Sequence, residues 1–162
     1  MLGTGLAVLD LVLLQPLFEK ITKEPHDLRI LEGVRGNWKV LVSWLVLIWT
    51  LVALGEEVLF RGFMMSQLVK LLGMSSLALA LNVLVTSTIF GLAHSYQGRS
   101  GTWSTIMIGL CLGVAFVLSG FNLSLPILTH GVINTVELIL ISRGEDARLR
   151  EVIWRKRELA HT

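Results

Sequence analysis

The chain has 162 residues, of which 53% are hydrophobic and 16% are charged, and its mean hydropathy is +0.70. Soluble domains average about 25% charged residues, so this composition indicates a membrane protein rather than an ordinary soluble domain. The formal net charge of +2 is too small to suggest nucleic acid as a partner, and none is expected. The single cysteine, Cys111, excludes an intrachain disulfide and a cysteine-based zinc site.

The first apolar stretch, residues 2–18, is long enough to span a hydrocarbon core of about 30 Å. It contains one acidic residue, Asp10, which we interpret as a polar side chain facing other helices. The stretch lacks the basic start and the small-residue cleavage site of a signal peptide, so we do not expect it to be cleaved. The mixed-charge connector that follows, residues 19–37, has no apparent catalytic chemistry.

A second apolar run, residues 40–54, leads directly into the adjacent carboxylates Glu56 and Glu57. Residues 58–72 then follow a helical pattern that two basic residues interrupt. We expect this segment either to continue the second span or to form an interfacial or re-entrant helix. Ionisable groups at membrane depth cost about 2.5–3.5 kcal/mol each on insertion scales, so they indicate a functional site.

Three more spans are predicted, at residues 75–93, 103–118 and 125–141, with a polar loop over residues 95–101. The predicted fold is therefore all-α, a polytopic membrane helix bundle of about five spans. The fourth span contains Gly109-x-x-x-Gly113, a spacing that allows close helix approach within one chain or between two copies.

Basic residues cluster in two segments of the sequence that flank the predicted spans. Of the 14 Lys and Arg, five lie between Lys20 and Lys39 and six between Arg143 and Arg157. The positive-inside rule then places the first connector and the C-terminal tail in the cytoplasm. We expect an integral protein of a prokaryotic cytoplasmic membrane, with membrane lipids as partners and a tail that touches anionic headgroups.

The acidic pair and Arg61 are expected to serve two different functions. Glu57 and Arg61 are four residues apart, so they share a helix face and form an ion pair. Glu56 points about 100° away and is free to act as a general base. An ion pair that only neutralises buried charge is the alternative explanation.

Three more polar residues lie in other predicted spans. His94 ends the third span, and His130 and Asn134 share one face of the fifth, where both side chains are able to donate hydrogen bonds to an oxyanion. Hydrogen bonding between helices would also explain them. Glu137 extends the same face and is best explained as a partner for another buried polar group. Separate burial of so many polar groups is costly, so we expect them to converge on one hydrated pocket.

The motifs Glu56-Glu57-x-x-x-Arg61-Gly62, Phe90-x-x-x-His94 and His130-x-x-x-Asn134 resemble the three signature motifs of the CPBP (Abi) family. This family comprises CAAX prenyl endopeptidases and bacteriocin-processing or immunity-type membrane proteins. The similarity covers roughly residues 31–141. It implies a protease domain over residues 31–142, preceded by an N-terminal span with its charged connector (residues 1–30) and followed by a basic cytoplasmic tail (residues 143–162).

The resemblance implies an intramembrane endopeptidase that hydrolyses a bond of a peptide or membrane-protein substrate near the membrane surface. The catalytic positions it implies are Glu56, His94, His130 and Asn134, with Glu57 and Arg61 as supporting residues. Glu56 and His94 would activate a water, while His130 and Asn134 would stabilise the oxyanion. The alternatives are a non-catalytic module for bacteriocin immunity or partner binding, and a small transporter that uses the polar residues as a proton relay.

The sequence departs from many relatives in two respects. Many prokaryotic members have Asp at the position of Asn134, and this chain has fewer spans than many of them. The smaller number of spans indicates that an upstream portion is either missing or supplied by an upstream membrane partner. A homo-oligomer is also among the expected assemblies.

A zinc site and a metal-free site are both compatible with the residue types. If a metal is present, Glu56, His94 and His130 are its expected ligands. The sequence has no His-Glu-x-x-His motif, and Asn134 is a poor zinc ligand, so we favour a metal-free, glutamate-type mechanism without a cofactor. A simple five-span arrangement, however, puts His94 on the opposite side from Glu56 and His130. Their convergence requires a tilted, broken or re-entrant element, for which residues 58–72 are the candidate.

Overall fold

The computed structural model describes residues 2–146, and this part of the chain is helical with no strand. Its elements in order are α1 (Leu2–Leu9), the π-helix η1 (Asp10–Leu14), α2 (Gln15–Thr22), the 3-10 helix η2 (Arg29–Val34), α3 (Trp38–Leu47), the π-helices η3 (Ile48–Glu56) and η4 (Val58–Met65), α4 (Ser66–Leu72), α5 (Ser76–Ala93), the 3-10 helix η5 (Ser95–Gln97), α6 (Gly98–Leu118) and α7 (Ser124–Ser142). The predicted tail lies outside the described residues from residue 147 onward.

Five helical segments are long and apolar enough to cross a membrane, which confirms the predicted all-α bundle of five spans. They are Leu2–Thr22, Trp38–Leu72, Ser76–Ala93, Ser95–Leu118 and Ser124–Ser142. Large apolar side chains cover their outer faces; Leu71, Leu77 and Leu118, for example, are 79%, 71% and 81% exposed. An apolar surface of this extent is unfavourable in water and suits a lipid environment.

The second span is a single helical segment of 35 residues, Trp38–Leu72. Residues 58–72 therefore continue the helical segment without a break, which was one of the two predicted alternatives. Asn37 caps its start, because the Asn37 side chain accepts a hydrogen bond from the Val40 N–H at 3.3 Å. Gly73, at φ +84°, ends it. Glu56 therefore lies inside this helix and not at its end. The helix is longer than the roughly 20 residues that suffice to cross a hydrocarbon core.

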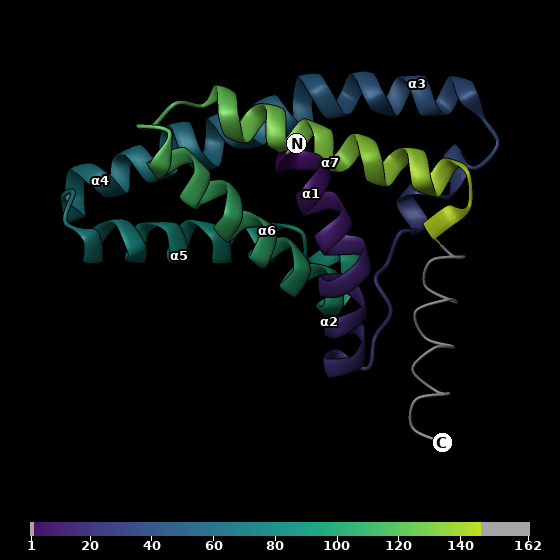
Figure 1. Cartoon of the computed structure of the whole chain (residues 1–162), viewed down its shortest axis with the longest axis horizontal. Helices are drawn as coiled ribbons and strands as arrows, with labels where there is room; N and C mark the ends of the chain where they lie inside the picture. Colours follow the sequence, from purple (N-terminus) through teal and green to yellow (C-terminus); the bar gives the residue numbers. More distant parts are fainter. Residues whose placement is uncertain (1, 147–162) are drawn as a thin grey trace.

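Helix α5 runs back along η4 and α4, and the two form an antiparallel hairpin (Figure 1). The first arm of the hairpin, from Glu56 to Leu72, and the returning arm, from Ser76 to His94, have similar lengths. His94 therefore returns to the level of Glu56, which removes the conflict of the simple five-span arrangement. Asn82 fastens the hairpin by donating a hydrogen bond from Nδ2 to the Met65 carbonyl at 2.8 Å.

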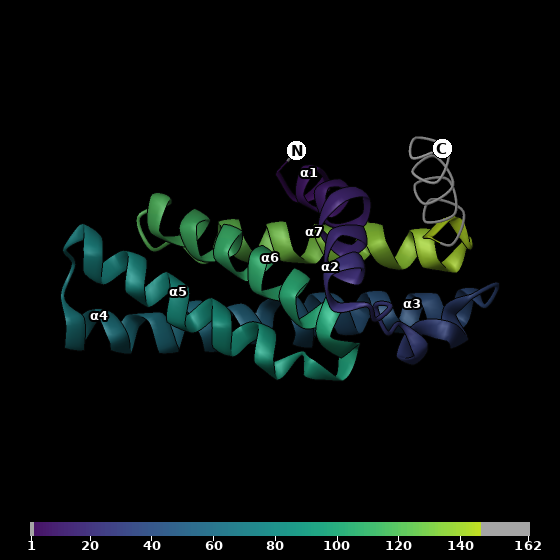
Figure 2. The same cartoon turned by 90° about the horizontal axis from the view of Figure 1, so that it is seen from below.

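Helix α6 packs closely along α5 and then connects to α7, which runs antiparallel to α3 (Figures 1 and 2). The close approach depends on small residues. A Cβ at Gly109 would meet Ser87 at 3.2 Å, and one at Gly113 would meet Val83 at 3.0 Å. The Gly109-x-x-x-Gly113 motif thus accounts for packing within the chain. The predicted loop at residues 95–101 is shorter than expected, because α6 already begins at Gly98.

The N-terminal helices cross the rest of the bundle, with α1 against α7 and α2 against α6 (Figure 2). The connector then passes between α6 and α7 on its way to α3. The Asp27 N–H donates to the Gln97 carbonyl at 3.0 Å, and buried Val34 packs with Ile48 and Leu138. The connector is therefore a packed part of the fold.

Candidate active site

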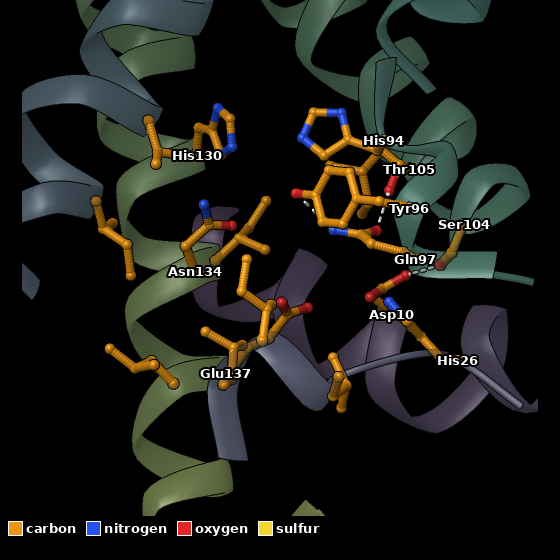
Figure 3. A pocket seen from close by; sticks show the side chains of 18 of the residues that line it. Asp10, His26, His94, Tyr96, Gln97, Ser104, Thr105, His130, Asn134 and Glu137 are labelled. Atoms are coloured by element: carbon orange, nitrogen blue, oxygen red, sulfur yellow. Dashed lines mark hydrogen bonds between the residues drawn. The ribbon is translucent and has the colours of Figure 1, made fainter. Parts of the chain in front are cut away.

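A cavity of about 170 Å³ lies where the hairpin, α7 and the N-terminal segments meet. Its polar lining residues are Asp10, His26, Asp27, Glu56, His94, Tyr96, Gln97, Ser104, Thr105, His130, Asn134 and Glu137. Figure 3 shows His130, Asn134 and Glu137 along one wall, on α7, with His94, Tyr96 and Gln97 on the facing wall. The structure thus brings residues from all of the predicted spans to one cavity.

Glu56 lies between two imidazoles. Its Oε2 atom is 3.6 Å from Nε2 of His94 and 4.0 Å from Nε2 of His130. That Oε2 atom is buried and accepts no hydrogen bond from any described residue. The distances exceed direct hydrogen bonds but suit one small polar molecule that contacts both partners.

Both imidazoles are oriented through their Nδ1 atoms. His94 Nδ1 lies 2.8 Å from the Phe90 carbonyl oxygen, and His130 Nδ1 lies 2.8 Å from Oε1 of Glu57. Because these oxygens accept, each Nδ1 is the protonated nitrogen, and each Nε2 faces the cavity. The ring of Phe90 lies against both, with centroid distances of 4.7 Å to His94 and 5.9 Å to His130.

Glu57 and Arg61 form the predicted ion pair behind this site. Arg61 Nη1 donates to Glu57 Oε1 at 2.8 Å, and the two side chains are 1% and 0% exposed. Arg61 Nη2 also donates to the Gly109 carbonyl at 2.9 Å, and the guanidinium lies 4.7 Å from the centroid of the Phe90 ring. A buried charge pair requires such additional contacts to offset its desolvation. Neither residue of the pair lines the cavity, and Glu57 contacts the Nδ1 atom of His130.

Asn134 lines the cavity one helical turn after His130, as its spacing predicts. Glu137 also lines it, so Glu137 faces the same cavity as the other polar residues. This position agrees with the predicted shared face, and the predicted role of Glu137 as a partner for another buried polar group stays a prediction.

Several cavity residues were missed because they lie outside the recognisable motifs. The connector contributes His26, Asp27 and Leu28, although no chemistry was apparent in it. Gln97 donates to the Tyr96 hydroxyl at 3.4 Å and accepts from the Thr105 hydroxyl at 3.1 Å, which orders the wall beside His94 (Figure 3). No spacing in the sequence marks these contacts, since they depend on how the connector crosses the bundle.

Asp10 is the exception, because its position within an apolar span was a visible signal. It is 4% exposed, and it accepts hydrogen bonds from Gln15 at 2.7 Å and from the Ser104 hydroxyl. It faces other helices, as expected, and it also reaches the cavity (Figure 3).

The cavity contains carboxylate and imidazole groups, which are residue types that can bind a metal ion. Two imidazoles held at Nδ1 are typical of zinc-bound histidines. Zinc, however, needs its ligands at about 2.0–2.3 Å, and within residues 2–146 no group of three His, Cys, Asp or Glu side chains is placed to hold a metal ion. We therefore derive no step through a metal.

An all-helical chain with five membrane-spanning segments and a cavity of carboxylate, imidazole and amide groups defines an integral membrane protein with an acid–base site. The chain belongs to the Rce1-like family of type II CAAX prenyl endopeptidases, whose model matches residues 37–136. It is thus a membrane protein of the CAAX-protease type, and the matched region contains all three motifs. No curated protein and no solved structure shows a significant match to the chain.

Proposed function

We propose that the protein is an intramembrane endopeptidase in which Glu56 and His94 activate a water that attacks a peptide bond. The observation that supports this most directly is the position of Glu56 Oε2, which lies 3.6 Å from His94 Nε2 and accepts no hydrogen bond from residues 2–146. Two acceptors that face each other at this distance are suited to a water that donates one hydrogen to each.

In the proposed reaction, Glu56 accepts a proton from the water while the water oxygen attacks the carbonyl carbon of the scissile peptide. His94 receives the second hydrogen bond and holds the water in line. The tetrahedral intermediate then collapses, the C–N bond breaks, and protonated Glu56 returns the proton to the departing amine. The products are a carboxylic acid and an amine, and no metal or redox cofactor enters the balance.

His130 and Asn134 are proposed to stabilise the oxyanion. The carboxylate of Glu57 orients the His130 ring through Nδ1, so that Nε2 points into the cavity toward the developing oxyanion. Asn134 lies one turn further along α7 and adds an amide donor. Preorganised donors of this kind are each worth about 10²–10³ in turnover in other hydrolases.

The first test is a cleavage assay on the purified protein with a library of membrane peptides. Glu56→Gln and His94→Ala should each abolish cleavage while the variants keep the far-UV spectrum and elution volume of the parent. A chelator should have no effect. Cleavage by Glu56→Gln at the parental rate would disprove the mechanism, and chelator inhibition reversed by zinc would disprove its metal-free form.

The orientation in the membrane is part of the proposal. We place the protein in a prokaryotic cytoplasmic membrane with its C-terminus in the cytoplasm, because basic residues concentrate in the connector and after Arg143. In a Cys111→Ser background, single cysteines at Met74 and Phe121 should react with an impermeant reagent from outside the cell. Labelling of both only after cell lysis would reverse the orientation.

A further inference from the structure

Tyr96 contributes a hydroxyl group to the cavity from the wall opposite α7. It lies in η5, two residues after His94, and the two rings are neighbours with their centroids 5.7 Å apart. Both side chains line the cavity. Figure 3 shows the Tyr96 hydroxyl directed away from its own wall, toward the side of the cavity on which Asn134 lies. The phenol hydroxyl and the Asn134 amide therefore face the same space.

Three side chains on this wall are linked by hydrogen bonds that run in one direction. The Thr105 hydroxyl donates to Gln97 Oε1 at 3.1 Å, and Gln97 Nε2 donates to the Tyr96 oxygen at 3.4 Å. Tyr96 thus receives a hydrogen bond and keeps its own hydrogen, which no acceptor within residues 2–146 takes. Because a phenol is a donor as well as an acceptor, this hydrogen is available to a molecule in the cavity.

The backbone next to Tyr96 is fixed by its neighbours. The Gln97 N–H donates to the His94 carbonyl at 2.9 Å, and the Gln97 carbonyl accepts from the Asp27 N–H at 3.0 Å. The side chain of Gln97 is held in addition by Thr105, eight residues further on in α6. A donor that acts on a transition state needs to be preorganised in this way, because reorientation during the reaction would cost part of the stabilisation.

The proposed hydrolysis places negative charge on the former carbonyl oxygen of the substrate. Asn134 faces this oxygen from α7, and His130 directs Nε2 into the same part of the cavity. A tyrosine hydroxyl on the opposite wall is a donor of the kind that oxyanion sites use, and it donates without a change in its own protonation.

Resting on the proposed function, we propose that Tyr96 is a further catalytic residue, whose hydroxyl donates a hydrogen bond to the oxyanion of the tetrahedral intermediate. The hydrogen stays on the Tyr96 oxygen throughout, so Glu56 still carries the proton from the water to the departing amine. Gln97 is the positioning residue, because its amide directs the Tyr96 hydroxyl toward the cavity. The oxyanion is then stabilised from two facing walls.

Tyr96→Phe tests the hydroxyl alone, since it keeps the ring that lies beside His94. For a cleaved membrane peptide, kcat should fall about 10- to 100-fold, at or below the loss for one oxyanion donor in other hydrolases, while KM changes less than about twofold. Thr102→Val is the matched control, because it removes a hydroxyl that lies in the first turns of α6 and does not line the cavity. It should leave both constants unchanged.

A second measurement follows binding without hydrolysis. A fluorescent peptide with a phosphinate in place of the scissile amide carries a tetrahedral, negatively charged group and so imitates the intermediate. Its affinity for the full-length protein in nanodiscs is measured by fluorescence anisotropy. Tyr96→Phe should weaken phosphinate binding by the same factor as kcat/KM. The affinity for the matching amide peptide, measured in the Glu56→Gln background, should change less than about twofold.

Gln97→Met tests the positioning role through a double-mutant cycle. The change removes the amide that donates to Tyr96, so kcat should fall about 3- to 10-fold, the effect of one neutral hydrogen bond. In the Tyr96→Phe background the same change should have no further effect. Equal losses in the two backgrounds would show that Gln97 acts independently of the Tyr96 hydroxyl and would overturn its positioning role.

Unchanged kcat and unchanged phosphinate affinity in Tyr96→Phe would overturn the inference and leave the endopeptidase intact. Equal weakening of the phosphinate and the amide peptide would also overturn it, because the hydroxyl would then act on the ground state. Phosphinate binding that depends on Tyr96, without cleavage of any peptide by the wild-type protein, would contradict the endopeptidase and uphold Tyr96 as an oxyanion donor. No binding of the phosphinate to the wild-type protein would overturn the inference.

Discussion

The Nδ1 atom of His130 lies 2.8 Å from Oε1 of Glu57, the same oxygen that Arg61 contacts at 2.8 Å. One buried oxygen of the Glu57 carboxylate therefore contacts both the Arg61 guanidinium, which neutralises it, and the His130 imidazole, which faces the cavity. This relationship gives the second glutamate of the Glu56-Glu57 pair a definite role, because it fixes the orientation of the His130 ring. Glu56 is left to act on the substrate side.

Glu57→Gln should reduce turnover about 10- to 100-fold, the usual effect of removing a charged partner of an active-site histidine. Gln keeps the shape and one acceptor but removes the negative charge that contacts both His130 Nδ1 and Arg61 Nη1. The measurement is kcat against KM for a cleaved membrane peptide. Because Glu57 does not line the cavity, kcat should fall more than KM changes. An unchanged kcat would show that His130 does not depend on Glu57.

Arg61→Ala should destabilise the protein by about 3–5 kcal/mol, because it leaves Glu57 buried without its cation and removes the donor to the Gly109 carbonyl. Unfolding by SDS titration in mixed micelles provides the measurement. Arg29→Ala is the matched control, because that pair is exposed and its loss should leave the midpoint unchanged. Equal midpoints for the two variants would show that burial of the Arg61 pair contributes nothing to stability.

Gly91→Ala should destabilise the contact between α5 and α6 by about 1–3 kcal/mol, the usual cost of overpacking. An added Cβ there would overlap Ile106 and lie 2.8 Å from the Thr102 carbonyl oxygen. Gly55→Ala is the control, since no neighbouring atom lies within 4 Å of an added Cβ. That change should be neutral or stabilise by up to about 1 kcal/mol, as expected when a helical glycine is replaced. A larger loss at Gly55 than at Gly91 would contradict the packing described here.

The pairing of Glu24 with Arg99 should make the order of the connector depend on pH. Hydrogen bonds from the side chain and backbone of Arg99 lower the pKa of Glu24 below its ordinary value. A lowered folded-state pKa means that the stabilisation is present above the unfolded value of about 4.3 and is lost as pH falls through the lower folded value.

A nitroxide attached at Glu32→Cys in a Cys111→Ser background reports this change by electron paramagnetic resonance. Its mobility should rise below about pH 4, and Glu24→Gln should raise it already at neutral pH and remove the pH step. The effect is small, less than about fivefold in the population of the loosened connector, because the pair is exposed. Identical spectra for parent and variant at both pH values would show that the pair does not hold the connector.

The motif residues and the five apolar spans were predictable from the sequence because their signals are local. Charges inside apolar runs are expensive, and a four-residue spacing places Glu57 beside Arg61 and His130 beside Asn134 on any helix. The helical class and the ion pair follow directly from these two rules, without knowledge of how the helices pack.

Only the tertiary structure showed how the polar residues reach one cavity. The second span does not end near Glu56 but continues to Leu72, and α5 returns along it to bring His94 level with Glu56. The sequence left the length of this helix open because two basic residues interrupt the apolar pattern, and Arg61 is tolerated there by its contacts with Glu57 and Gly109. The contribution of the connector residues His26, Asp27 and Leu28 was missed for a related reason. They have no characteristic spacing, and they reach the cavity because α1 and α2 pack across α7 and α6. Local spacing determined which residues share a helix face, whereas the meeting of different helices depended on packing contacts between residues far apart in the chain.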